Sequence, residues 1–190
     1  APVLDAGAKP LIVGGDHAIS YPVLRAVTKK HGPLTIVHFD AHADLYDEFD
    51  GRRFSHACPF ARVMEHCPQH RLIQIGVRSV NRHLLDQALK FGVQSIPAHE
   101  FSVDRVPSDI EGPVYVSVDI DALDPAFAPG VSHHEPGGLT TRDILSVVQN
   151  LRGEVIGADI VEFNPRRDVN DMTAMVTAKL VRELGHKLLP

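Results

Sequence analysis

Short and continuous apolar runs recur along the chain, and they predict strands that are buried on both faces. Five runs are clear and one is weaker: residues 11–13, 34–39, 72–77, 114–118 and 155–161, with the weaker one at 93–96. Runs without alternating polar residues are typical of parallel strands that helices cover on both sides. We therefore expect these segments to lie together in one parallel sheet.

Apolar stripes at helical spacing lie between most of these runs. Ser20 is a possible N-cap for one helix, and residues 84–89 form the stripe of a second. Thr140 and Asp143 have the spacing of a capping box, and Asp171 is the expected cap of a last helix. This alternation of strands and helices predicts an α/β fold with three layers, α-β-α, around a mainly parallel sheet.

The composition is that of an ordinary globular protein, with 190 residues of which 44% are hydrophobic and 23% charged. This length favours a single domain over residues 1–190. With 19 Lys and Arg against 24 Asp and Glu, the formal charge of −5 argues against nucleic acid as a partner. No apolar run approaches the roughly 18 residues of a membrane helix. Cys58 and Cys67 do not form a C-x-x-C pair, so we expect a reducing, cytoplasmic location.

Polar side chains that can bind metal follow three of the predicted strands. In α/β folds the ligand site lies beyond the carboxyl ends of the strands. Residues two apart on extended backbone point the same way, so closely spaced ligands share one side of the chain. The candidate ligands are His17 after the first run, Asp40, His42 and Asp44 after the second, and Asp119 and Asp121 after the fifth.

This set of side chains predicts a centre for two divalent cations. Four carboxylates converging without a nearby Lys or Arg would repel one another, and some would stay protonated. Carboxylates with imidazole and no thiolate favour Mn²⁺, with Zn²⁺, Co²⁺ or Ni²⁺ as alternatives. Two ions about 3.5–4 Å apart can share a hydroxide, which is a strong nucleophile. A lone D-x-H or D-x-D is common in loops, but the combination indicates a metal-dependent hydrolase.

Two further residues are candidates for catalysis. His56 lies in a polar loop beyond the second strand and can move protons at the mouth of the site, unless it is an ordinary surface histidine. Glu162 follows the last apolar run, where a buried carboxylate needs a partner. A cationic substrate and the nearby Arg166 or Arg167 are equally compatible with that need.

Taken together, these motifs resemble the ureohydrolase family, which contains arginases, agmatinases and related guanidino hydrolases. The matching stretches come in the family's order: residues 14–17, 39–44, 117–125, 136–139 and 157–165. The resemblance implies the arginase/deacetylase fold and a pair of Mn²⁺ ions. One ion would bind His17, Asp40, Asp44 and Asp119, and the other would bind His42, Asp40, Asp119 and Asp121.

The resemblance also implies a reaction and its residues. Glu162 matches the carboxylate that holds the substrate guanidinium, and His56 matches the proton-shuttling histidine. The products would be urea and a primary amine. Guanidinium stays charged at working pH and pairs well with a planar carboxylate, which agrees with this assignment. The family's small-molecule enzymes are trimers or hexamers, so we expect a homo-oligomer.

Within the family, residues 46–57 and 124–133 are most similar to plant-type arginases, which places arginine slightly ahead of other substrates. Tyr46 occupies the position where animal arginases carry an asparagine that contacts the α-carboxylate of arginine. Agmatinase and guanidinobutyrase activities therefore stay open. Family members run to about 300 residues, and this chain begins just before the first metal motif, so the family's N-terminal part is missing from it.

Two readings from other classes compete with this one. A zinc deacetylase on the same fold needs one metal held by an Asp, His, Asp set, whereas His17 and the pair of Asp40 and Asp44 favour two metals. The shortened chain is alternatively a catalytically inactive, metal-binding assembly partner, which metal content and urea release distinguish. We expect His38 to face away from the ligands. His133 and His134 lie in a Pro- and Gly-rich loop after the Asp119 strand, where a surface position is favoured and the pocket lining is the alternative.

Overall fold

The computed structural model describes residues 2–189 and contains one six-stranded sheet. Every strand pair is parallel, and the order across the sheet is β1-β6-β5-β2-β3-β4. Each predicted apolar run forms a strand. The strands are β1 (Leu11–Val13), β2 (Thr35–Phe39), β3 (Arg71–Ile75), β4 (Gln94–Ile96), β5 (Pro113–Asp119) and β6 (Glu154–Val161).

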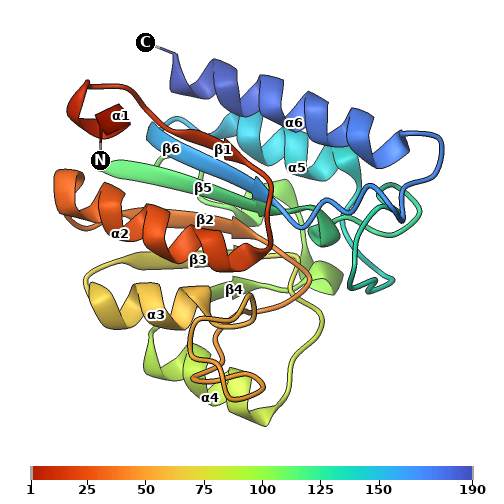
Figure 1. Cartoon of the computed structure of the whole chain (residues 1–190), viewed down its shortest axis with the longest axis horizontal. Coiled ribbons are helices and arrows are strands. Elements are labelled where there is room, and N and C mark those ends of the chain that lie inside the picture. Colours follow the sequence, from red (N-terminus) through yellow and green to blue (C-terminus); the bar gives the residue numbers. More distant parts are fainter. Residues whose placement is uncertain (1, 190) are drawn as a thin grey trace.

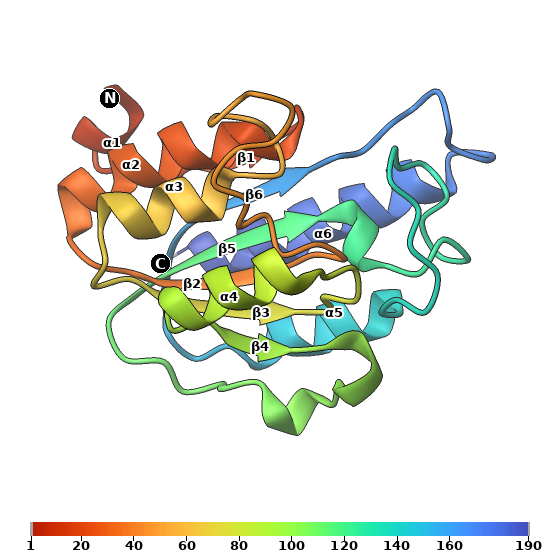
Figure 2. The same ribbon diagram turned by 90° about the horizontal axis from the view of Figure 1, so that it is seen from below.

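Helices cover both faces of this sheet, as Figures 1 and 2 show. Four of them correspond to the predicted stripes. The short α1 and α3 were not predicted, although Phe60, Val63 and Met64 give α3 an apolar stripe at helical spacing. The α-helices are α1 (Pro2–Asp5), α2 (Ser20–His31), α3 (Pro59–His66), α4 (Arg82–Lys90), α5 (Thr141–Asn150) and α6 (Met172–Leu188).

Two apolar cores hold the three layers together. On one face, Ile144 of α5 and Leu180 of α6 pack against the sheet. On the other face, Leu24 of α2, Phe60 of α3 and Leu84 of α4 pack against it. The predicted α-β-α arrangement is therefore confirmed (Figures 1 and 2). No helix within residues 2–189 is long and apolar enough to cross a membrane.

The helix caps agree with the sequence at one position and differ at another. Thr140 and Asp143 form the predicted capping box at the start of α5. Ser20 is not a cap: it is the first residue of α2, and its buried hydroxyl has no hydrogen-bond partner. The chain enters α2 through a short 3-10 turn, His17–Ile19, and Asp16 caps that turn by accepting from the N–H of Ala18.

The cap expected at Asp171 was also wrong. Asp171 has a left-handed backbone with φ of 58°, and its side chain makes no capping hydrogen bond. Asp168 takes this role instead, because its carboxylate accepts from the N–H groups of Thr173 and Ala174. The loop folds back before the helix starts. The capping carboxylate therefore comes from a residue that lies earlier in the chain than the usual cap position.

Strand order decides where the polar residues meet. Strand β6 lies between β1 and β5, and β5 pairs directly with β2. The carboxyl ends of these four strands lie at the same level in the sheet. Val13 and Val118 both pair with Ile160, and Phe39 pairs with Val118. The loops after β1, β2, β5 and β6 therefore leave one edge of the sheet side by side.

Candidate metal centre

All six predicted ligands come together beyond this edge. His17 lies in the 3-10 turn after β1, and Asp40, His42 and Asp44 follow β2. Asp119 ends β5, and Asp121 lies in the next 3-10 turn, Ile120–Ala122. Five of the six are buried, and the side chain of His42 is 26% exposed. The spacing argument therefore identified a real cluster.

One half of the cluster surrounds the Nδ1 atom of His17. This nitrogen lies 3.1 Å from Asp40 Oδ2, 3.1 Å from Asp44 Oδ2 and 3.2 Å from Asp119 Oδ2. It is buried, yet it has no partner in hydrogen-bond geometry. Ligand bonds of about 2.0–2.2 Å in octahedral geometry place neighbouring donor atoms about 3 Å apart. The four side chains thus fit a divalent cation.

The other half is built around His42. Its Nδ1 atom lies 3.1 Å from Asp121 Oδ2 and 3.4 Å from Asp40 Oδ1. Asp40 turns one oxygen toward His17 and the other toward His42, so it stands between the two halves. Asp40, His42 and Asp121 also form a group whose ligand atoms lie close enough for one ion. This arrangement fits a second cation that shares Asp40 with the first.

The electrostatics of the cluster indicate a demand for positive charge. Burial raises the pKa of Asp44 to about 7 and the pKa of Asp119 well above its usual range. Burial acts to lower the pKa of His42, but Asp121 and Asp40 outweigh it and raise that pKa to about 11. The crowded carboxylates therefore hold protons on themselves and on the imidazoles, which is the charge that metal ions replace.

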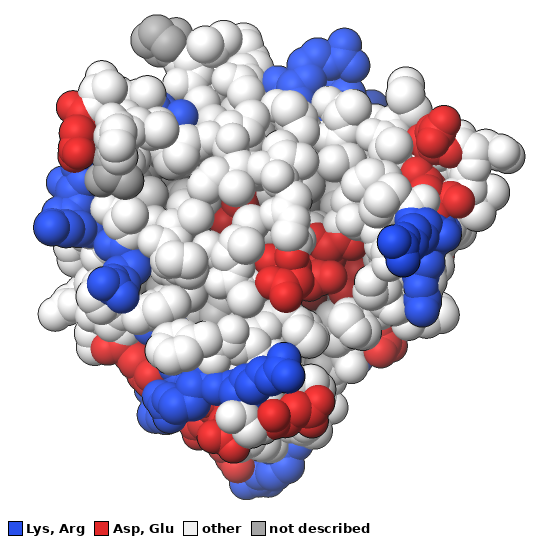
Figure 3. Space-filling view, in the orientation of Figure 1, with Lys and Arg blue, Asp and Glu red and all other residues white. Residues whose placement is uncertain are grey.

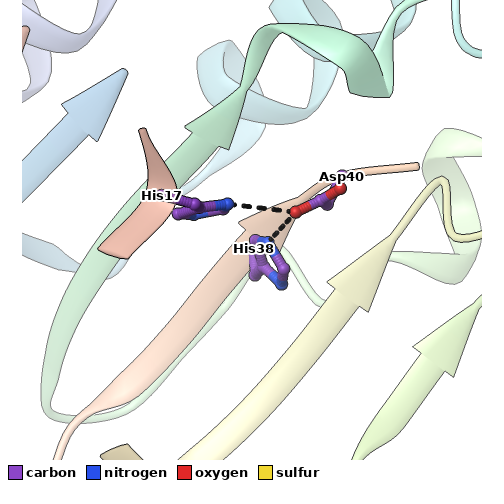
Figure 4. Close-up of side chains that lie close together, drawn as sticks. All are labelled: His17, His38 and Asp40. Atoms are coloured by element: carbon purple, nitrogen blue, oxygen red, sulfur yellow. Dashed lines mark hydrogen bonds and ion pairs between the residues drawn. The ribbon is translucent and has the colours of Figure 1, made fainter. Parts of the chain in front are cut away.

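His38 does not face away from the cluster, which corrects the expectation for this residue. Its Nε2 atom lies 2.8 Å from Asp40 Oδ2, and Figure 4 shows that His38 and His17 converge on this carboxylate. The side-chain amide of Gln74 donates to Ala43 O and contacts His38 Nδ1 at 3.0 Å. His38 Nδ1 therefore accepts, its Nε2–H donates to Asp40, and His38 orients Asp40 without being a ligand.

Backbone geometry helps to aim these side chains. Asp44 and Glu162 have left-handed backbones with φ of 51° and 64°, which is uncommon outside glycine. Gly15 has φ of 78°, and a Cβ there would lie 3.0 Å from Ile19 Cγ2, so the turn before His17 needs glycine. Glu162 ties the loops together, since its Oε1 accepts from the N–H of His17 at 3.0 Å.

A pocket of about 450 Å³ opens over the cluster. Its charged lining is acidic, and no Lys or Arg lines it among the described residues. Figure 3 shows a group of acidic side chains in the middle of one face of the molecule. The lining residues are His42, Asp44, Tyr46, Phe49, Asp50, His56, Ala57, Ser79, Leu84, Asp119, Asp121, His133 and Glu162.

Both predicted catalytic residues line this pocket. Burial raises the pKa of Glu162, so a cation bound beside it favours the charged form of the carboxylate. Arg167 donates instead to the backbone oxygen of Ser132 at 3.3 Å, which leaves Glu162 available to a ligand. His56 is half-buried, and its Nδ1 lies 3.4 Å from Ser55 Oγ.

His133 also lines the pocket, which was the less favoured of its two predicted positions, and it is exposed in its loop. Its ring stacks on His56 with centroids 5.3 Å apart and lies edge-on to His42 at 6.1 Å. The long loop after β5 carries it there, and Asp124 closes this loop by accepting from Gly137 and Gly138. A histidine in a Pro- and Gly-rich loop has no periodic signal, so only the return of the loop brings it to the site.

The fold and site define a class of protein: an α/β protein with a carboxylate-rich candidate metal centre at the carboxyl ends of a parallel sheet. Comparison with known proteins gives the family. The Arginase family model matches residues 1–186, and the chain belongs to this family. It is 54% identical over 189 residues to Arginase 1, mitochondrial, of Arabidopsis thaliana and 37% identical over 190 residues to the agmatinase of Bacillus anthracis.

Solved structures agree with this assignment. The arginase from Medicago truncatula superposes with a TM-score of 0.88 at 50% identity, covering 95% of this chain and 59% of that one. The matches to the Arabidopsis arginase and the Bacillus agmatinase cover 95% and 96% of this chain, but 55% and 64% of those proteins. The chain therefore spans little more than half the length of the plant relatives that it matches.

Proposed function

We propose that the chain holds two Mn²⁺ ions and hydrolyses a small guanidino compound to urea and a primary amine. The observation that carries this proposal is the pocket over the cluster, whose charged lining consists of five carboxylates without Lys or Arg among the described residues. The five are Asp44, Asp50, Asp119, Asp121 and Glu162. The two ions would balance the charge of Asp44, Asp119 and Asp121, which leaves the carboxylates of Asp50 and Glu162 to attract a cationic substrate. Enzymes of the arginase family act on small molecules, which agrees with this.

The side chains of this pocket suit the reaction. His17, Asp40, Asp44 and Asp119 would hold one ion, and His42 with Asp121 would complete the second site through Asp40 and Asp119. When bound, the two ions activate water as the nucleophile. Water adds to the guanidinium carbon, and the bond from that carbon to the alkyl nitrogen then breaks.

Two residues bind the substrate and move the proton. The carboxylate of Glu162 pairs with the planar guanidinium and fixes its carbon in the pocket. The departing amine nitrogen takes a proton, and His56 at the pocket wall is placed to deliver it. His133 stacks against the His56 ring and limits its rotation.

Arginine is the first candidate substrate, because the plant relatives at 51–54% identity are named arginases. Agmatine is the second candidate, and one specific observation favours it. No cationic side chain among the described lining residues is available for the α-carboxylate of arginine, and Tyr46 is a pocket residue. Agmatine lacks that carboxylate.

The test is urea release from arginine, agmatine and 4-guanidinobutyrate after Mn²⁺ loading, with metal content per chain measured on the same sample. Urea from any of the three supports the proposal and identifies the substrate. Two ions bound without urea would favour an inactive assembly partner, and a chain that binds no metal would refute the proposal.

Glu162→Gln is the matched variant for this test. The amide keeps the size of the side chain and an oxygen that accepts from the N–H of His17. A hydrogen bond to a charged group contributes about 1.5–3 kcal/mol, so kcat/KM should fall about 10- to 150-fold while both ions stay bound. Loss of metal in this variant would instead place Glu162 among the ligands.

The compartment and the assembly stay predictions. Cys58 and Cys67 are buried and unpaired, which suits a reducing compartment such as the cytoplasm. Several plant relatives are named mitochondrial, so localisation of the tagged full-length protein in an organelle would correct this proposal. A homotrimer or homohexamer is the expected assembly, which light scattering of the purified protein tests.

A further inference from the structure

A row of buried polar side chains crosses the sheet just below the metal centre. Gln74, His38, Ser117 and Asp159 occupy the same register in β3, β2, β5 and β6, the four neighbouring strands. Each is at most 1% exposed. Burying polar groups inside a sheet is costly unless each finds a partner, so the row needs a reason to be there.

One end of the row leads from Asp159 to His17. Asp159 Oδ1 accepts from the Ser117 hydroxyl at 2.6 Å, and Ser117 Oγ lies 3.0 Å from His17 Nε2. A serine hydroxyl has one hydrogen, and here Asp159 takes it. Ser117 Oγ can then only accept, so His17 carries hydrogen on Nε2.

This direction of hydrogen bonding matters at the other nitrogen of the same ring. A neutral His17 with hydrogen on Nε2 presents a lone pair on Nδ1, the atom that faces Asp40, Asp44 and Asp119. That tautomer is the one that binds a cation. A carboxylate that fixes a ligating imidazole from behind is a known way to orient the ring and increase its basicity.

We propose that Asp159 is a positioning residue of the metal centre, which acts through Ser117 to fix the ring orientation and tautomer of His17. The inference rests on the proposed function, because it concerns the same centre. Asp159 lies in the middle of an apolar strand, is not among the residues that line the pocket and would not itself bind metal or substrate.

At the other end of the row, the hydrogen bonds turn an N–H group, and not a bare nitrogen, toward the metal centre. Both ends of the row therefore fix how a histidine faces the centre. Gln74 donates to His38 Nδ1, so His38 carries its hydrogen on Nε2 and donates it to Asp40. The row therefore makes one imidazole a ligand and the other a donor to a ligand. The two buried histidines, with centroids 5.0 Å apart, share the same tautomer, but His17 turns its bare Nδ1 toward the centre and His38 turns its Nε2–H toward it.

The test measures Mn²⁺ binding by calorimetry in Asp159→Asn and Ser117→Ala. In Asp159→Asn the amide can donate to Ser117 Oγ, which frees the hydroxyl to donate to His17 Nε2 and favours the wrong tautomer. Loss of such outer partners typically weakens metal binding about 10- to 100-fold. Mn²⁺ binding at the two halves is told apart with His17→Ala and His42→Ala, each of which should abolish one binding step. We expect the weakening in the step that His17→Ala abolishes, and no change in the step that His42→Ala abolishes.

Tyr115→Phe is the matched control. Tyr115 donates to Asp159 Oδ2 at 2.8 Å, so this variant also removes a hydrogen bond from the buried carboxylate, but it leaves the link to His17 intact. It should lower the melting temperature without weakening the His17 step. Equal weakening in Tyr115→Phe would mean that Asp159 serves only the stability of the fold, and would overturn the proposal.

Two further outcomes complete the test. If Asp159→Asn does not fold, Ser117→Ala carries the comparison, because it keeps the bond between Tyr115 and Asp159. Wild-type binding in Ser117→Ala would refute the positioning role while leaving the proposed function standing. A wild-type chain that binds no Mn²⁺ would instead refute the proposed function and with it this inference.

Discussion

Asp40 is the residue on which the two halves of the centre depend together. It is fully buried, and its two oxygens face His17 and His42 separately. Of these two histidines, Asp44 lies close only to His17, so it belongs to one half of the centre. Its left-handed backbone shows that the chain accepts strain to bring this carboxylate into place.

This difference predicts how two single substitutions affect metal content. Asp40→Ala removes a carboxylate that both ions would share, so we expect fewer than one bound Mn²⁺ per chain. Asp44→Ala removes a ligand from one site only, so one ion should stay bound. Elemental analysis after dialysis measures both, and two ions retained in Asp40→Ala would contradict the shared position of this residue.

His56→Ala should separate proton transfer from metal binding. General acid–base groups contribute about 10²- to 10⁴-fold to rate, so turnover should fall by about 100-fold or more while both ions stay bound. His134→Ala is the matched control, because His134 is exposed and contacts only the backbone oxygen of Pro129. Steady-state urea assays and metal analysis on the same samples check the result, and lost metal would make His56 a ligand.

At the residue scale, the sequence reveals ligands that stand at fixed intervals after a strand and conceals those that do not. Asp40, His42 and Asp44 were predictable because extended backbone gives them a common direction. His133 was open to two positions, the surface and the pocket, since a loop without fixed spacing carries it there. Asp159 gave a partial signal, because a carboxylate in the middle of an apolar strand needs a buried partner, but its partner could not be identified before the strands were placed.

Helix α6 shows the same contrast at the scale of an element. An apolar stripe predicted the helix but not its cap. The cap comes from Asp168, which precedes the helix and accepts from the N–H groups of Thr173 and Ala174 across the loop. Strands were the most predictable elements, since every apolar run became one. Helix α3 was missed although Phe60, Val63 and Met64 have helical spacing, because its eight residues are shorter than the stretch over which such spacing is a clear signal.

Asp168→Ala should destabilise the protein through this cap. Loss of a capping carboxylate costs about 0.5–2 kcal/mol, which denaturant unfolding of the metal-free protein can measure. Asp171→Ala is the control, because Asp171 makes no capping bond with its side chain. An equal loss in both variants would show that the helix start, rather than the capping carboxylate, is being perturbed.

The same cap predicts a dependence on pH. Burial acts to raise the pKa of Asp168, but the hydrogen bonds from Thr173 and Ala174 outweigh it and lower that pKa below its usual value. The folded state therefore prefers the ionised form. Its contribution should be complete above about pH 4, the unfolded value, and lost as the pH falls through the folded value. The difference in unfolding free energy between wild type and Asp168→Ala, measured against pH, should shrink in acid.

Arg78 connects the elements around the second metal site. Its guanidinium donates to the backbone oxygens of Asp121, Ala122 and Glu135, among others, and so holds the turn after β5 against the loop above it. Arg78→Met would remove this donor from the oxygens of Asp121 and Glu135, at about 1–3 kcal/mol for each that stays buried, whereas Ala122 O still accepts from the N–H of Leu139. We expect weaker Mn²⁺ binding in the His42 step by calorimetry, while Arg82→Met, on an exposed arginine, should bind as wild type.

At the scale of the whole molecule, metal binding should stabilise the fold. A ligand at 100 times its dissociation constant adds about 2.7 kcal/mol, and a domain of this size gains about 2–4 °C for each kcal/mol. Saturating Mn²⁺ should therefore raise the melting temperature by several degrees in differential scanning fluorimetry, and EDTA should reverse the shift. Asp40→Ala provides the control, and a full shift in that variant would locate the stabilising ions elsewhere.

The arrangement of layers was predictable, whereas the order of strands was not. Alternating apolar runs and helical stripes are local patterns, and they sufficed for a parallel α-β-α fold. The position of β6 between β1 and β5 depends on contacts between segments about 150 residues apart, for which one sequence carries no local signal. The neighbourhood of His17 and Asp40 was therefore inferred from their chemistry.

The position of β6 also determines when the centre can form during folding. Strand β1 pairs only with β6 within the described chain, so His17 has no place on the sheet until residues 154–161 have been inserted. A nascent chain that ends before those residues would carry the ligands of the His42 half, Asp40, His42, Asp119 and Asp121, on strands that pair directly, but it would not place His17. Such long-range closure is a late and slow event in folding. Formation of the His17 half thus marks completion of the topology, and an ion bound there closes a fold that the rest of the chain has already built.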